Sequence, residues 1–199
     1  MADGMSGRAT SELAASARVL AAVAADPHLA ATVHDVAAAC LESIRAGGKV
    51  LLCGNGGSAA DAQHIAGEFV SRFRFDRPGL PAIALTTDSS VLTAIGNDYG
   101  YEHVFARQVQ ALGRRGDVLI AYSTSGRSPS VLRALEAGRD SGLACVGMTG
   151  NRGGPMRDLC RFLLEVPSDE TPRIQEGHLA LGHAVCDLVE RMAFGGPRP

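Results

Sequence analysis

Apolar residues follow two different patterns along the chain, and the pattern changes at Lys49. Before that point, about Ser11–Ala25 and Pro27–Ala46 are rich in alanine and carry apolar residues at intervals of three and four. This spacing predicts two amphipathic helices. An Asp-Pro pair precedes the second helical stretch and a Gly-Gly pair follows it, which are ordinary start and stop signals for a helix.

After Lys49 the apolar residues gather into short runs, separated mostly by helical patterns or Gly/Ser loops. Near-continuous apolar runs are typical of strands that are buried on both faces, as in a parallel sheet with helices on both sides. The sequence therefore predicts an α/β fold, a doubly wound, flavodoxin-like αβα sandwich with extra N-terminal helices. Its five strands are expected within residues 49–54, 80–86, 117–124, 143–149 and 161–167, followed by a long helix over about Thr171–Ala193.

Helices that precede the first strand are additions to such a unit and need an apolar surface to cover. They either pack against another subunit or form a lid over their own sheet, and the sequence leaves both possibilities open.

Length, charge, cysteine spacing and the lack of targeting signals limit the classes of protein to which this chain can belong. A chain of 199 residues is long enough for one domain with a substantial core. A net charge of −2 provides no broad basic face, which argues against nucleic acid as a partner. The 5 cysteines are widely spaced without a CxxC pair, so we expect buried free thiols. Neither a signal peptide nor a long uncharged apolar run is visible, so we expect a cytoplasmic protein without a membrane partner.

Two loops combine glycine with hydroxyl residues at predicted strand ends, Gly54–Ser58 and Ser123–Ser128. In an open parallel sheet, ligands bind beyond the carboxyl ends of the strands. Glycines let the backbone approach a ligand, and hydroxyls and helix N–H groups donate to an anion. One such loop alone would be an ordinary turn with a serine cap; two at equivalent strand ends favour a phosphate site. Neither loop matches the common nucleotide-binding motifs.

His64 and Glu68 are four residues apart and share one face of the helix that follows the first loop. The pair suits a general base, a metal site or both, although an isolated pair is more often only a surface contact. Arg72 continues nearly the same face and could touch the substrate, whereas Arg74 and Arg77 are expected at a solvated helix end.

Polar residues also occur in two later segments. On the last helix, Gln175 and His183 would be about 12 Å apart along the axis and roughly 80° apart around it, so they could share a ligand only from its two sides. His178 on the same helix could equally be a core or interface residue. Between the two loops, Gly96–Asp98 interrupts a helical pattern, either as a turn or as a set of polar groups for sugar hydroxyls.

Five motifs, in this order, resemble the phosphoheptose isomerases of the sugar isomerase (SIS) family: CGNGGSAADAQHIAGEF, LTAIGNDYGYE, STSGRSPSVL, GMTGNRGG and RIQEGHLALGH. The resemblance implies a single SIS domain over residues 1–199, with an α/β core at about 49–194 and helices at about 10–46 that pack on partner subunits of a homotetramer. Active sites would lie at the subunit interfaces. The implied reaction converts sedoheptulose 7-phosphate to D-glycero-heptose 7-phosphate, as the manno epimer, through an enediol, and begins nucleotide-activated heptose biosynthesis.

The resemblance also implies roles for individual residues. Glu68 matches the general base and His183 its acid partner. The ligands of zinc-containing members match His64, Glu68, Gln175 and His183, with one Zn²⁺ per subunit. The substrate-binding residues are expected to be Asn55, Gly56, Gly57, Ser58, Glu68, Arg72, Asn97, Asp98, Ser123, Thr124, Ser125, Ser128 and Gln175.

Two alternatives use the same fold. A non-catalytic SIS protein would bind a sugar phosphate as a sensor or bind a replication initiator, but it would have no use for Glu68 together with His183. Another SIS enzyme, a ketohexose-phosphate isomerase or a muramic-acid phosphate lyase, would share the serine loop but not the HIAGEF and RIQEGH motifs together. The residues do not determine which C2 epimer forms, since that depends on the face of the enediol that Glu68 meets.

Overall fold

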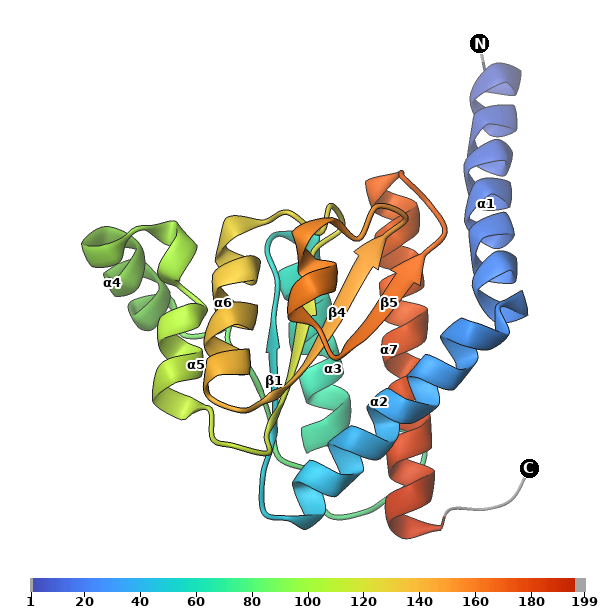
Figure 1. Cartoon of the computed structure of the whole chain (residues 1–199). Helices are drawn as coiled ribbons and strands as arrows, with labels where there is room; N and C mark the ends of the chain where they lie inside the picture. Colours follow the sequence, from blue (N-terminus) through green and yellow to red (C-terminus); the bar gives the residue numbers. More distant parts are fainter. Residues whose placement is uncertain (1, 196–199) are drawn as a thin grey trace.

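The computed structural model describes residues 2–195 and places a five-stranded parallel sheet between two layers of helices (Figure 1). The strand order is β2-β1-β3-β4-β5, and every neighbouring pair is parallel. This confirms the predicted fold class. The strands are β1 (Val50–Cys53), β2 (Ala82–Ala84), β3 (Val118–Tyr122), β4 (Ala144–Gly150) and β5 (Phe162–Val166).

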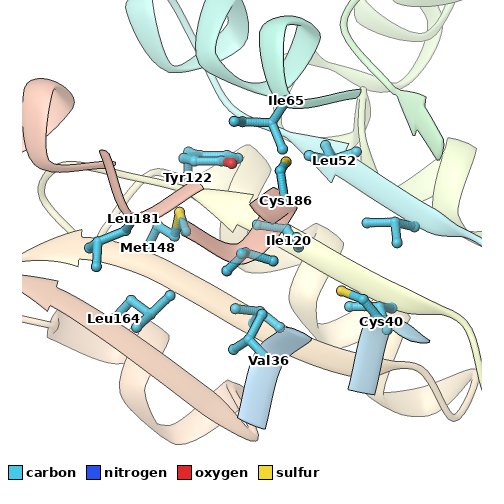
Figure 2. Close-up of a cluster of buried hydrophobic side chains, with 14 of the residues drawn as sticks. Val36, Cys40, Leu52, Ile65, Ile120, Tyr122, Met148, Leu164, Leu181 and Cys186 are labelled. Carbon is cyan, nitrogen blue, oxygen red and sulfur yellow. The ribbon is translucent and has the colours of Figure 1, made fainter. Parts of the chain in front are cut away.

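Successive residues of the central strands face two separate apolar cores, which explains their continuous apolar character. Leu52 and Ile120 belong to one core and Leu51 and Leu119 to the other, because side chains alternate across a strand. Figure 2 shows the first core, where α2 (Pro27–Arg45), α3 (Gly57–Val70) and α7 (Thr171–Phe194) cover the sheet. The opposite core lies under α5 (Ala106–Leu112) and α6 (Pro129–Asp140).

The chain reverses its direction of travel across the sheet between β1 and β3. From β1 it moves outward to β2, then returns to pair β3 on the other side of β1. Such a switch point opens a crevice at the carboxyl ends of the two strands, where ligands bind in open α/β sheets. Both Gly/Ser loops follow these two strands.

The two N-terminal helices behave differently. Val36 and Cys40 of α2 are buried in the first core, so α2 covers its own sheet. In contrast, α1 (Ala2–Ala25) projects beyond the body of the molecule (Figure 1). Of its side chains from residue 5 onward, only Val19 and Val23 pack against that core. The predicted start near Ser11 is wrong: no proline interrupts the preceding residues, and an established helix extends easily.

The expected break at Gly96–Asp98 is also wrong, because these residues lie inside α4 (Ser89–Tyr99). The side chain of Asp88 caps this helix by accepting from the N–H of Val91. The chain turns instead at Gly100, whose φ of 90° only glycine adopts readily. A short 3-10 helix, η1 (Tyr101–His103), follows directly.

All five cysteines are free thiols, as expected. Burial raises the pKa of Cys40 and of Cys160 to about 12, so neither is a reactive thiolate near neutral pH. None of the described helices combines the length and apolar character needed to cross a bilayer.

Candidate active site

The two Gly/Ser loops lie side by side because β1 and β3 are direct neighbours, with Cys53 paired to Ala121. Asn55 of the first loop bridges them: its Nδ2 donates to Ser128 Oγ at 2.8 Å and to Ser130 Oγ at 2.9 Å. Gly56 has a φ of 58°, and Gly57 begins α3. Ser58 is buried in the first turn of that helix. The two loops therefore form one continuous polar surface at the carboxyl ends of β1 and β3.

The second loop offers an anion several donors at the start of α6. Ser128 occupies the N-cap position without a side-chain bond to the helix, so its hydroxyl remains available at the positive end of the helix dipole. Ser125 is exposed and accepts from the N–H of Arg127 at 3.2 Å, Thr124 is half-buried, and Ser123 is buried. These hydroxyls and the helix N-terminus suit a phosphate group.

Gly126 determines the shape of this loop. Its φ of 63° is left-handed, and a Cβ there would collide with the carbonyl oxygen of Gly153 in the loop after β4. Only glycine permits this approach, so the serine loop is held tightly against residues 150–154.

Two imidazoles and a carboxylate meet between α3 and α7. His64 Nε2 lies 2.9 Å from His183 Nε2 and 3.3 Å from Glu68 Oε1, and one ligand atom from each residue lies within 4.8 Å of the others. The helices come this close because Gly182 has no side chain: a Cβ there would lie 2.7 Å from Ile65 Cδ1. The predicted association of His64, Glu68 and His183 is thus present in the fold.

Burial and neighbouring charges affect the pKa of His183. Partial burial lowers the pKa most, and His64 and Arg74 lower it further, while Glu68 raises it. The lowered pKa favours a neutral imidazole, which is the form that binds a metal. Two imidazole nitrogens and one carboxylate oxygen are a common catalytic zinc set, so these residues fit the ion.

Gln175, the fourth expected zinc ligand, lies beside the first loop. Its Nε2 would be 2.5 Å from a Cβ built on Gly57, so the amide rests against the start of α3. Gly57 precedes His64 by seven residues, about 10 Å along the helix. Gln175 therefore lies at the loop end of α3, and its part in binding metal stays a prediction.

Gly57→Ala tests this placement. Gly57 has no left-handed backbone strain, so the fold should survive, but the new methyl group must displace Gln175. We expect kcat/KM to fall at least tenfold with little change in the unfolding midpoint. Gly7→Ala on α1 is the matched control, since nothing lies within 4 Å of its Cβ; equal activity in both variants would show that the position of Gln175 is unimportant.

Three predicted substrate residues lie apart from the loops. Asn97 Nδ2 donates to Asp98 Oδ1 at 2.7 Å, and both residues are exposed on α4. Arg72 does not continue the His64 face, because α3 ends at Val70. It is exposed and lines an open pocket of about 610 Å³ together with His64 and Glu68.

Arg77 is not at a solvated helix end, contrary to expectation. Its side chain is 2% exposed and pairs with that of Glu190, 1% exposed, at 3.0 Å. The guanidinium also donates to the carbonyls of Phe69 and Glu68 at 2.6 and 2.7 Å, satisfying the last turn of α3. Arg74 is exposed, as expected.

Glu190 holds the segment that follows α3. Its carboxylate accepts from the backbone N–H groups of Phe73 and Arg74 at 2.9 and 2.7 Å. Burial raises the pKa of Glu190, but these bonds and Arg77 outweigh it, so the net pKa is below its ordinary value. Phe73 in turn lies 5.5 Å from the ring of His183, which links this buried pair to the site.

Sequence reasoning missed two residues at the loops and left a third undecided. Tyr101 donates to Asn55 Oδ1 at 2.9 Å, and the buried Ser130 accepts from Asn55. Neither has a spacing signal, although both lie in quoted motifs. His178 is fully buried, 5.8 Å from the ring of Tyr122, and burial lowers its pKa to about 4, so it is a core residue.

Comparison with known proteins gives consistent matches. The family model for the SIS domain matches residues 13–150. A phosphoheptose isomerase of Burkholderia pseudomallei (strain 1710b) is 69% identical over 186 residues, 94% of each chain. One from Aneurinibacillus thermoaerophilus is 56% identical over 184 residues, 92% of this chain and 93% of the relative. The solved phosphoheptose isomerase of Neisseria gonorrhoeae superposes with a TM-score of 0.87 at 43% identity, covering 94% of this chain and 98% of that chain.

Proposed function

Since this chain belongs to the SIS family, and within it to the phosphoheptose isomerases, we propose that it converts sedoheptulose 7-phosphate to D-glycero-heptose 7-phosphate. Two observations support this most strongly: the serine loop lies at a switch point of the sheet, and Glu68 and His183 meet between α3 and α7. A binding protein would need the loop but not the carboxylate and imidazole.

The reaction divides naturally between these groups. A ketose becomes an aldose when a proton leaves C1, an enediol forms, and a proton returns to C2, while another proton moves from O1 to O2. We assign the carbon-bound proton to the carboxylate of Glu68 and the oxygen-bound proton to His183. Glu68 is half-buried, so its carboxylate keeps access to substrate.

The serine loop would hold the phosphate at the far end of the substrate. Ser125 and Ser128 have exposed or half-buried hydroxyls at the start of α6, and phosphate needs donors there. Asn55, Gly56 and Gly57 would line the sugar, as would Asn97 and Asp98 if a partner subunit completes the site.

Ser125→Ala and Ser128→Ala should mainly weaken substrate binding. Each removes a donor to a charged group, worth about 1.5–3 kcal/mol, so KM should rise by roughly ten- to a hundredfold with a smaller change in kcat. Steady-state kinetics with sedoheptulose 7-phosphate measure both constants. An unchanged KM in both variants would place the phosphate elsewhere.

We further propose that His64, Glu68 and His183 hold one Zn²⁺ per subunit, with Gln175 as a fourth ligand. Bound zinc would act as a Lewis acid that stabilises the negative charge on the enediolate oxygens. The three ligand atoms within 4.8 Å of one another support this assignment.

Removal of zinc by a chelator should abolish most activity, and added Zn²⁺ should restore it. Elemental analysis should find about one zinc per chain in the active protein, and His64→Ala should lower that content. Full activity in metal-free protein would show that Glu68 and His183 act without an ion.

We also propose how the protein assembles and where it acts. The chain forms a single domain over residues 1–199 and assembles as a homotetramer with active sites at subunit interfaces. It is a cytoplasmic enzyme that catalyses the first step of nucleotide-activated heptose biosynthesis. The projecting α1 supports the tetramer, because Met5 and Leu13 are 69% and 72% exposed and need cover. We assign the manno epimer to the product.

Proton NMR of purified protein with sedoheptulose 7-phosphate tests the activity directly. The anomeric signals of an aldose should grow with time, and their couplings identify the C2 epimer. Line broadening of the substrate without conversion would instead indicate a sugar-phosphate sensor.

A further inference from the structure

A tyrosine hydroxyl from outside both Gly/Ser loops contacts the first loop. Tyr101 follows the turn at Gly100, and its hydroxyl donates to Asn55 Oδ1 at 2.9 Å. The side chain is 61% exposed, so this hydrogen bond, not core packing, ties it to the loop. Tyr101 and Asn55 line an open pocket of about 410 Å³ together with Ser128 and Ser130.

This bond engages the oxygen of the Asn55 amide, whose nitrogen already has two partners. An asparagine side chain has one carbonyl oxygen and two N–H hydrogens. Here the oxygen accepts from Tyr101, and the nitrogen donates to Ser128 Oγ at 2.8 Å and Ser130 Oγ at 2.9 Å. Ser130 is only 2% exposed, so its partner is within the protein. The amide oxygen faces Tyr101, and this orientation is favoured because a phenol hydroxyl is more acidic than a serine hydroxyl and is therefore the stronger donor.

The orientation decides what the two serines can do. A hydroxyl that accepts from Asn55 keeps its own hydrogen, which it can donate. A phosphate monoester carries about −1.5 to −2 charges near pH 7 and needs donors. If the amide were reversed, its oxygen would take the serine hydrogens, and Ser128 would turn lone pairs toward the anion.

We propose that Tyr101 is a positioning residue that acts through Asn55, keeping Ser128 as a hydrogen-bond donor toward the phosphate of the substrate, while the buried Ser130 helps to hold the amide. This inference rests on the proposed function and deepens its phosphate site. Tyr101 sets the direction of this series of hydrogen bonds, because its hydroxyl is the only partner of Asn55 Oδ1 found among the described residues.

Tyr101→Phe in the full-length protein tests the inference. Without the hydroxyl the amide is free to reverse, so KM for sedoheptulose 7-phosphate and the inhibition constant of inorganic phosphate should both rise roughly five- to thirtyfold. The value of kcat should change less than threefold, since the phosphate is remote from the reacting carbons. Tyr99→Phe is the matched control: its ring stacks on Arg107 at 3.9 Å, and the ring is retained.

A double-mutant cycle with Asn55→Ala separates action through Asn55 from a direct contact. Tyr101→Phe should add no further loss of phosphate affinity once Asn55 is absent. Additive losses, or a KM for Tyr101→Phe within twofold of wild type, would overturn the inference. A fall in kcat with unchanged KM would also overturn it, because Tyr101 would then serve the reacting end.

Direct titration with inorganic phosphate separates this inference from the proposed function. If wild-type protein fails to isomerise sedoheptulose 7-phosphate, calorimetry still compares phosphate binding by wild type, Tyr101→Phe and Tyr99→Phe. Weakened binding in Tyr101→Phe alone would support the hydrogen-bond chain in a protein of another activity. Equal binding by all three would overturn it.

Discussion

Glu68→Gln is expected to lower kcat by about 10²- to 10⁴-fold, the range that a positioned general base contributes. The amide has the shape of the carboxylate but cannot take a proton from C1. Its oxygen can still approach His64 Nε2, which lies 3.3 Å from the carboxylate, so the site should keep its form. Steady-state kinetics measure the loss, and inhibition by inorganic phosphate shows that the phosphate site remains.

Glu136→Gln is the matched control for this change. Glu136 pairs with Arg133 at 3.0 Å on the exposed surface of α6, away from the reacting groups. Its activity should equal that of wild type. If Glu68→Gln keeps activity within tenfold of wild type, another group is the base. Zinc content must be measured in the same variant, so that loss of the ion is distinguished from loss of the base.

Glu190→Gln is expected to lower the free energy of unfolding by about 3–5 kcal/mol. The change leaves the Arg77 guanidinium buried without its counterion, and the neutral amide can no longer match two backbone N–H groups and a guanidinium. Urea unfolding should show a lower midpoint at an unchanged slope. The variant should also lose activity at the urea concentration at which it unfolds. Glu190 holds the segment of Phe73, and the ring of Phe73 lies against His183.

Asp187→Asn provides the comparison, because Asp187 pairs with Arg74 and Arg191 at the more exposed side of the same helix. Ion pairs of this kind contribute about 0–1 kcal/mol, so its midpoint should hardly move. Equal destabilisation by the two substitutions would show that burial of the Arg77–Glu190 pair adds nothing to the free energy of unfolding.

The same carboxylate gives stability a defined dependence on pH. The pKa of Glu190 in the folded protein is below its ordinary value of 4.5. A lowered folded pKa means stability that is present above the unfolded pKa and lost as pH falls through the folded pKa. Wild type should therefore lose more stability below about pH 4.5 than Glu190→Gln does.

Local patterns predicted most of the fold and part of the site. Parallel strands buried on both faces are apolar throughout, so the runs around Val50–Cys53 and Val118–Tyr122 were recognisable from composition. His64 and Glu68 could be paired because helix geometry brings residues i and i+4 together. The two loops could be recognised from composition, because glycine permits a close backbone approach and serine offers a hydroxyl donor.

Contacts between distant segments were beyond local reasoning. Arg77 meets Glu190 across 113 positions, and nothing near Arg77 distinguishes it from the exposed Arg74. The chain turns at Gly100 and not at Gly96, because α4 tolerates a glycine but a φ of 90° requires one. The approach of His183 to His64 depends on Gly182, a residue whose importance is visible only when two helices pack.

Glu68 is proposed to carry a proton between C1 and C2 of sedoheptulose 7-phosphate. The most direct test is proton NMR of the reaction in deuterated water, with wild type and Glu68→Gln side by side. We predict an aldose product with deuterium at C2 for wild type, because the carboxylate exchanges its proton with solvent before it returns one to C2. Glu68→Gln should form product at least about a hundredfold more slowly. Equal turnover by the variant would contradict this account, because another group would then be the base.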